Sequence, residues 1–347
     1  MTESENKPQL RLPAEWEPQQ AVMIAWPHKD TDWNYMLDHV TECYTNLARV
    51  IVKYAKLIVV APDTAPIRQI LCDVDESRIA FIDIDTNDTW TRDYGAITTI
   101  DANGQPVYND FCFNGWGLKF AANLDNLVTR KMVFSGILQG RYNNHLGFVL
   151  EGGSIESDGN GTILTTRECL LSPNRNGDLT RREIGRYLKH TFGARKVLWL
   201  DHGALAGDDT DSHIDTLARL APNNTILYTG CENPADEHYD ELVSMRNDLR
   251  AMVNADGIPF NLVELPLPDA VYDEDGLRLP ATYANFLVIN EAVLVPVYNQ
   301  PKKDRLACQI MRIAFPEHEI VPIDCSALIR QHGSLHCATM QFPVINL

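Results

Sequence analysis

Two short segments contain candidates for nucleophilic and acid/base chemistry, namely Cys337 in one and His213 with Asp215 in the other. Cys337 follows a glycine-containing turn inside an apolar segment, with His336 beside it. A cysteine in this setting is either a core thiol or a nucleophile, and core thiols are the commoner case. His213 and Asp215 are one residue apart, so they would point to the same side if the segment were extended. A histidine beside a carboxylate is a general acid/base arrangement, although an exposed acidic loop explains the segment equally well.

Two further carboxylates have neighbours that suit a cationic ligand. Glu151 ends an apolar run and precedes two glycines, which would let the backbone approach a ligand closely. A glutamate at the end of a strand and facing water is an equally good explanation. Asp93 lies close to Trp90, and an aromatic wall beside a carboxylate suits a cation. A surface loop in which Arg92 contacts Asp93 is the commoner outcome for such a segment.

We expect neither a metal nor a cofactor. The acidic run 208–215 resembles a calcium loop at first sight. Counting from Asp209, however, position 6 is Ile214, where an EF-hand needs glycine, and position 12 is Leu220, where it needs glutamate. His202 is the one further histidine close to this run, and no C-x-x-C pair or glycine-rich nucleotide motif occurs.

Alternating strands and helices must position these side chains. Short β-branched runs predict strands at 21–26, 57–61, 79–84, 147–150, 196–200, 225–229, 261–265, 286–289, 292–297 and 320–323. Helical spacing predicts helices at 34–56, 179–192, 237–253 and 302–315. This order is typical of an α/β chain. About five strand–helix–strand units repeat with a period of roughly 70 residues, and no linker interrupts them, so we expect a single domain over 1–347.

The composition limits the possible partners. The chain has 347 residues with 30 Lys+Arg and 47 Asp+Glu, a formal net charge of −17. This charge disfavours nucleic acids and anionic membrane surfaces, and it permits a small cationic substrate. No apolar run approaches the roughly 20 residues that span a bilayer, and Met1–Lys7 is polar, so we expect a cytoplasmic protein. A homo-oligomer is possible.

Six motifs together resemble the agmatine deiminase/bacterial-type peptidylarginine deiminase family of guanidine-modifying enzymes. They are Trp26-Pro27-His28, Trp90-Thr91-Arg92-Asp93, Phe113-Asn114-Gly115-Trp116-Gly117, Glu151-Gly152-Gly153, His213-Ile214-Asp215 and His336-Cys337-x-Thr339. The matches run from about residue 16 to residue 343. The resemblance implies an α/β fold built as a five-bladed, pseudo-symmetric ββαβ propeller with a central active site.

The resemblance also implies a role for each candidate residue. Cys337 would be the nucleophile and His213 the general acid/base. Glu151 would contact both the guanidinium and the histidine. Asp93 and Asp215 would bind the guanidinium nitrogens, and Trp90 would form a wall of the pocket. Attack by the thiolate would give a covalent thiouronium intermediate, which water would then hydrolyse.

The expected reaction is the hydrolysis of agmatine to N-carbamoylputrescine and ammonia. The alternatives are deimination of arginine or of peptidyl arginine and, from another class, a non-catalytic protein that binds guanidine or cations. The segment 332–341 departs from the family's usual glycine-rich run before His-Cys and its Thr-Gln-Gln-like end. This departure leaves the recognition of the substrate's tail open.

Overall fold

The computed structural model describes residues 10–343, so the Met1–Lys7 segment considered above lies outside the described residues. Within them, the strands form five sheets of three or four strands and one two-stranded ribbon. The strands are β1 (Ala21–Ala25), β2 (Lys56–Ala61), β3 (Ile79–Asp83), β4 (Ile97–Ile100), β5 (Pro106–Cys112), β6 (Arg141–Val149), β7 (Ile155–Ser157), β8 (Thr162–Thr166), β9 (Lys196–Leu200), β10 (Ala218–Ala221), β11 (Thr225–Gly230), β12 (Asn261–Pro266), β13 (Val271–Tyr272), β14 (Arg278–Leu279), β15 (Leu287–Ile289), β16 (Ala292–Val297), β17 (Glu319–Asp324) and β18 (Met340–Phe342).

The five larger sheets share one strand pattern. In β4-β5-β6, β7-β8-β9, β10-β11-β12 and β15-β16-β17 the first two strands are antiparallel and the last two are parallel. The fifth sheet, β18-β1-β2-β3, also begins with an antiparallel pair, and its first strand comes from the C-terminal end of the chain. The first and last strands of the described chain therefore meet in one sheet.

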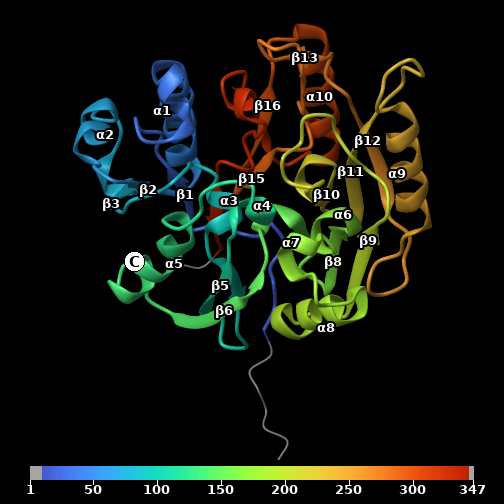
Figure 1. Ribbon diagram of the computed structural model, residues 1–347, viewed down its shortest axis with the longest axis horizontal. Helices are drawn as coiled ribbons and strands as arrows, with labels where there is room; N and C mark the ends of the chain where they lie inside the picture. The colour runs from blue at the N-terminus through green and yellow to red at the C-terminus, as the bar shows by residue number, and fades with distance from the viewer. Residues whose placement is uncertain (1–9, 344–347) are drawn as a thin grey trace, which may run out of the picture.

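Helices connect the parallel strands, as parallel pairing requires. The helices are α1 (Leu37–Tyr54), α2 (Ala65–Ile70), α3 (Thr91–Tyr94), α4 (Gly115–Leu118), α5 (Val128–Phe134), α6 (Arg167–Leu170), α7 (Pro173–Asn176), α8 (Arg181–Phe192), α9 (Tyr239–Ala251) and α10 (Pro301–Ala314). In Figure 1 the long helices α1, α8, α9 and α10 lie at the periphery, whereas the short α3 and α4 lie at the centre. The α/β prediction is confirmed.

The predicted long helices are present, with corrected ends. The stretch expected to be one helix over 34–56 is a 3-10 turn (Asp32–Met36) followed by α1. It stops at Tyr54 because Ala55 is extended (φ −143°, ψ 173°) and Lys56 begins β2. For α8, Thr180 and Glu183 form a capping box, and left-handed Gly193 ends the helix.

Eight strands lie outside the ranges predicted as strands: β4, β5, β7, β8, β10, β13, β14 and β18. Strand β5 shows the reason, because it carries buried Asn109 and Asp110 among its apolar residues. The amide of Asn109 is satisfied by hydrogen bonds to the Ile97 carbonyl (2.8 Å) and to Thr99 Oγ1 (3.0 Å). Such a strand has no continuous apolar run, because side-chain hydrogen bonds replace apolar contacts. Strand β6 also extends well before the predicted 147–150.

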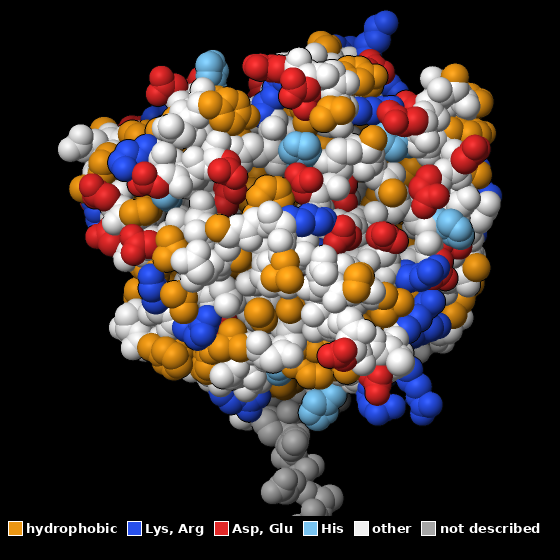
Figure 2. Space-filling model, viewed as in Figure 1, with side chains coloured by type: hydrophobic (Ala, Val, Ile, Leu, Met, Phe, Trp, Pro, Cys, Tyr) orange, Lys and Arg blue, Asp and Glu red, His pale blue; other side chains and the backbone are white. Residues whose placement is uncertain are grey.

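The outer surface carries most of the charge. Figure 2 shows acidic side chains dispersed over the visible face among basic and apolar ones. Among residues 10–343, no helix is both long enough and apolar enough to cross a membrane.

Candidate active site

Each of the five larger sheets contributes polar residues from the segment just before its first strand. Asp93 precedes β4, Glu151 precedes β7, and His213 and Asp215 precede β10. Asn285 and Cys337 occupy the same position before β15 and β18. The shared topology therefore carries chain segments that are far apart in sequence to one place.

The thiol of Cys337 faces a cavity of about 330 Å³. The side chain is 5% exposed. Its Sγ lies 3.3 Å from Asn285 Nδ2 and 3.7 Å from Asp215 Oδ2. Burial, together with the nearby carboxylates of Asp215 and Asp93, raises the pKa of the Cys337 thiol well above its usual value.

Asn285 holds the backbone at the nucleophile. Its Oδ1 accepts hydrogen bonds from the amides of His336 (2.9 Å) and Cys337 (3.3 Å). Its Nδ2 reaches the sulfur and also the Asp215 carbonyl, 3.3 Å away. Asn285 is not among the site residues expected from the sequence. The signal that could have found it is its position, because it precedes the first strand of its unit as Asp93 does.

His213 is fully buried, and neither of its ring nitrogens has a hydrogen-bond partner. Nδ1 lies 3.7 Å from Asp93 Oδ1. Burial alone would lower the pKa of His213, but Asp93 and the neighbouring Cys169 raise it to about 10. The histidine is therefore positively charged at neutral pH and has a proton to donate.

The expected His213–Asp215 pairing is wrong in one respect. The segment is not extended, because Ile214–Thr216 forms a 3-10 turn. The Asp215 carboxylate accepts a hydrogen bond from His336 Nδ1 (2.8 Å) instead, and Asp93 is the carboxylate within ion-pair distance of His213. Adjacent positions in the sequence did not indicate these partners.

The carboxylates of Asp93 and Asp215 have different hydrogen-bond partners and pKa shifts of opposite direction. Asp93 accepts from Trp116 Nε1 and from the Gly153 amide, both at 2.9 Å. Burial raises the pKa of Asp93, although His213 opposes that shift. Burial would also raise the pKa of Asp215, but its hydrogen bond from His336 lowers it below the usual value. The second oxygen of Asp215, Oδ1, is buried with no partner.

Glu151 is fully buried and paired with Arg175 of α7. The Arg175 Nε lies 2.9 and 3.1 Å from the two carboxylate oxygens. The two glycines after Glu151 are required by space. A Cβ on Gly153 would lie 2.7 Å from His213 Nδ1, and one on Gly152 would lie 2.2 Å from a backbone oxygen.

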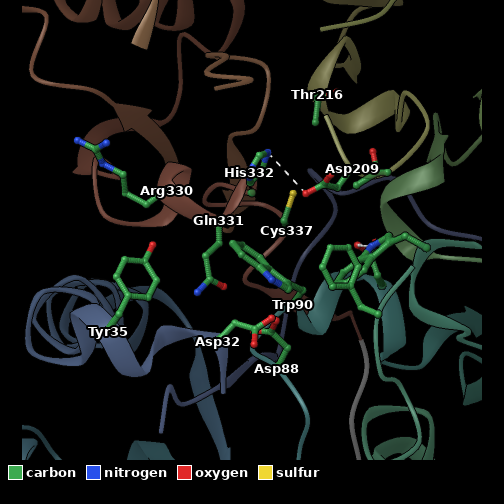
Figure 3. Close-up of a pocket in the computed structure, with 15 residues that line it drawn as sticks. Asp32, Tyr35, Asp88, Trp90, Asp209, Thr216, Arg330, Gln331, His332 and Cys337 are labelled. Atoms are coloured by element: carbon green, nitrogen blue, oxygen red, sulfur yellow. Dashed lines mark hydrogen bonds and ion pairs between the residues drawn. The ribbon is translucent and has the colours of Figure 1, made fainter. Parts of the chain in front are cut away.

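Aromatic rings form the walls of the cavity. Trp90 lines it, and in Figure 3 its indole lies beside Cys337, with Asp32 and Asp88 below. Gly333 packs directly on this ring, since a Cβ there would lie 2.3 Å from Trp90 Cζ3. Trp116 forms the second aromatic wall, and its backbone is unusual because its φ is 55°. This left-handed conformation is unfavourable for a non-glycine residue. In it, the indole N–H donates a hydrogen bond to Asp93.

Charged groups surround the rest of the cavity. Asp32, Asp88 and Asp209 contribute carboxylates to its lining, together with Arg330 and His332. Burial raises the pKa of Asp88 to about 7. His332 Nδ1 lies 3.5 Å from Asp209 Oδ2 (Figure 3).

Two groups of side chains within residues 10–343 have the spacing of metal ligands. One is Glu151, Cys169 and His213, whose candidate ligand atoms all lie within 4.8 Å of one another. Arg175 already supplies a positive charge to that glutamate. The other, Glu15, Glu156 and His336, surrounds the guanidinium of Arg219. In both groups the chain itself supplies a cation to the carboxylates.

The chain is similar to known deiminases over nearly its whole length. The model of the Porphyromonas-type peptidyl-arginine deiminase family matches residues 11–343. An agmatine deiminase from Medicago truncatula is 31% identical, over 99% of this chain and 100% of that protein. A solved Cys-to-Ser variant of the C. jejuni agmatine deiminase, with substrate bound, is 37% identical with a TM-score of 0.91, and the match covers 99% of both chains. A structure from Porphyromonas gingivalis, provisionally named an arginine deiminase, is 49% identical with a TM-score of 0.91, over 96% of this chain and 98% of that one.

Proposed function

Since this chain belongs to the Porphyromonas-type peptidyl-arginine deiminase family, we propose that it hydrolyses agmatine to N-carbamoylputrescine and ammonia. Family membership makes it a hydrolase that acts on the C–N bond of a guanidino group. One observation carries the proposal: the Cys337 thiol and Asp93 line one cavity, and the buried His213 and Asp215 lie directly behind them, 3.7 Å from Asp93 Oδ1 and from the Cys337 sulfur, respectively.

Binding begins with the guanidinium between Asp93 and Asp215. A guanidinium is planar and offers several N–H donors, which carboxylates bind by charge-assisted hydrogen bonds. The buried Oδ1 of Asp215 lacks a partner and can accept a hydrogen bond from a guanidinium N–H. Trp90 and Trp116 would flank the cation.

The bound cation then favours the thiolate. The two carboxylates keep the Cys337 proton in place while the cavity is empty. A guanidinium between them neutralises much of that charge, and the N–H of Asn285 remains to stabilise the sulfur anion. Substrate binding therefore releases the thiol proton to solvent, and the anion is directed at the guanidinium carbon.

The reaction proceeds in two displacements. The sulfur of Cys337 bonds to the guanidinium carbon, His213 gives its proton to one nitrogen, and ammonia leaves with the electrons of the broken C–N bond. Neutral His213 then takes a proton from water as the hydroxide adds to the thiouronium carbon. Collapse breaks the C–S bond, regenerates the thiolate and yields the protonated urea, whose excess proton is taken up by ammonia. Glu151, held by Arg175, would orient the nitrogen side of the substrate.

The cavity lining favours agmatine over arginine. Asp32, Asp88 and Asp209 suit the distal ammonium of agmatine, and they would repel an α-carboxylate. One observation favours arginine as the second candidate, namely the guanidinium of Arg330 in the same lining. The side chain of Arg330 already donates to the Tyr272 carbonyl (3.1 Å).

The five sheets are also proposed to be blades of one propeller in a single catalytic domain. The support is their common strand pattern and the common origin of the site residues before each first strand. The cytoplasmic location, the homo-oligomeric state and the lack of nucleic-acid and membrane partners stay predictions from the sequence.

A substrate panel tests the proposed function. Purified protein is assayed for ammonia release from agmatine, free arginine and a peptide that contains arginine. The expected result is the highest kcat/KM for agmatine, with activity abolished in Cys337→Ala and retained in Cys72→Ala, an exposed cysteine. Higher activity on arginine would transfer the substrate assignment. Undiminished activity in Cys337→Ala would refute the nucleophile, and binding without ammonia release would favour a non-catalytic guanidine-binding protein.

A further inference from the structure

His336, the neighbour of the nucleophile, lies between two buried carboxylates. Its Nδ1 is 2.8 Å from Asp215 Oδ2, and its Nε2 is 2.7 Å from Glu15 Oε2. Arg219 Nη2 also lies 3.1 Å from Nε2, but the Glu15 oxygen is closer, and ionised carboxylates only accept hydrogen bonds, so a proton on each ring nitrogen satisfies both carboxylate contacts. A neutral imidazole would set a lone pair against one of the two oxygens.

We propose that His336, kept as an imidazolium by Glu15, is a positioning residue that orients the Asp215 carboxylate toward the guanidinium. The chemical consequence rests on the proposed function, whereas the charged state of the histidine follows from the contacts alone. Neither residue touches the reacting atoms, so both act through Asp215.

Glu15 is built into the fold as an anion. It lies 321 residues before His336, ahead of β1, and is 9% exposed. One of its oxygens accepts from the Val288 amide (2.8 Å), and the other accepts from Arg219 Nη2 (2.9 Å) as well as from the histidine. Burial alone would raise the pKa of Glu15, but Arg219 and His336 hold it well below its usual range.

Among the groups that these ion pairs join, the formal charges cancel when His336 is charged. The anions are Glu15, Glu156 and Asp215, and the cations are Arg92, Arg219 and His336. Three negative charges thus meet three positive ones in a fully buried region. An uncompensated buried charge is strongly unfavourable, so the cluster as a whole favours the imidazolium.

This arrangement decides which oxygen of Asp215 is free. Oδ2 is occupied by the His336 N–H and lies 3.7 Å from the Cys337 sulfur. Oδ1 is buried and has no partner. With one oxygen tethered, the carboxylate cannot rotate freely, and the second oxygen stays available for a guanidinium N–H.

Two substitutions separate the two contacts of His336. The amide nitrogen of asparagine overlays Nδ1 of histidine, so His336→Asn can still donate to Asp215 but not to Glu15. The amide nitrogen of glutamine overlays Nε2, so His336→Gln can reach Glu15 but not Asp215. We expect kcat/KM for agmatine to fall about 10- to 150-fold further in His336→Gln than in His336→Asn, the range for a hydrogen bond to a charged group.

Stability and cluster controls distinguish positioning from general damage. Glu156→Gln perturbs the same buried cluster through Arg219 and does not contact Asp215. We expect it to lower the thermal midpoint by as much as His336→Gln does, with a much smaller loss of kcat/KM. Equal losses in His336→Asn and His336→Gln, or losses in all three variants that follow the thermal midpoint, would overturn the proposal.

A spectroscopic measurement tests the charged state without any activity. Histidine ¹⁵N NMR of the wild-type protein at pH 7 should show a ring with both nitrogens protonated, distinct from that of His213, that is absent from His336→Gln. A neutral ring assigned in this way would overturn the proposal. Failure of wild-type protein to release ammonia from any guanidine would instead refute the proposed function and leave the NMR result standing.

Discussion

The indole N–H of Trp116 offers the sharpest test of the proposed guanidinium site. Trp116→Phe removes this one donor and keeps an aromatic ring against Phe113 and Phe120, whose centroids lie 5.0 and 5.5 Å away. The lost bond is the 2.9 Å contact to Asp93 Oδ2. A hydrogen bond to a charged group contributes about 1.5–3 kcal/mol. At about 1.4 kcal/mol per tenfold, kcat/KM for agmatine should fall roughly 10- to 150-fold.

The pH profile gives the same substitution a second readout. The Trp116 hydrogen bond lowers the pKa of Asp93, against the larger effect of burial. Its removal should raise that pKa further, so the acid limb of kcat/KM moves to higher pH. Ammonia release from agmatine is measured between pH 5 and 9 for wild type, Trp116→Phe and the control Trp199→Phe. Trp199 lies in β9, where its ring contacts Arg181 outside the cavity lining. An unchanged kcat/KM and acid limb in Trp116→Phe would refute the role given to Asp93.

Four further outcomes are expected. Gly333→Ala forces Trp90 to move, because the new Cβ would lie 2.3 Å from the ring, and kcat/KM should fall by up to about 100-fold with an unchanged circular dichroism spectrum. Arg175→Gln leaves Glu151 buried without its cation and should lower the free energy of unfolding, measured in urea, by about 3–5 kcal/mol. In the wild type, kcat/KM should decline as pH falls through the pKa of Asp93, which burial raises, because the protonated carboxyl no longer attracts a cation. Added salt should raise KM for agmatine, since screening weakens attraction between a protein of net charge −17 and a dication.

The periodic parts of the fold could be predicted from the sequence. The apolar face of α1 and the β-branched runs of β2 and β16 consist of buried residues that recur at regular spacing within one segment. A short window of sequence therefore contains the pattern that predicts each element. Strands β5 and β18 escaped prediction because their environment is supplied by distant residues. Strand β18 is three residues long and exists through its pairing with β1, more than 300 residues away.

The sequence by itself determined the residue types of the site. Short motifs placed a thiol, a histidine and carboxylates beside glycines and tryptophans, and their order along the chain matched a family. Only the tertiary structure determined which of these side chains contact one another. In the folded chain Asp215 accepts a hydrogen bond from His336, Asp93 lies within ion-pair distance of His213, and Asn285 contacts the sulfur of Cys337. Hydrogen bonds depend on distances of tenths of an ångström between atoms whose separation along the chain carries no such information, and those distances arise only when the sheets pack together.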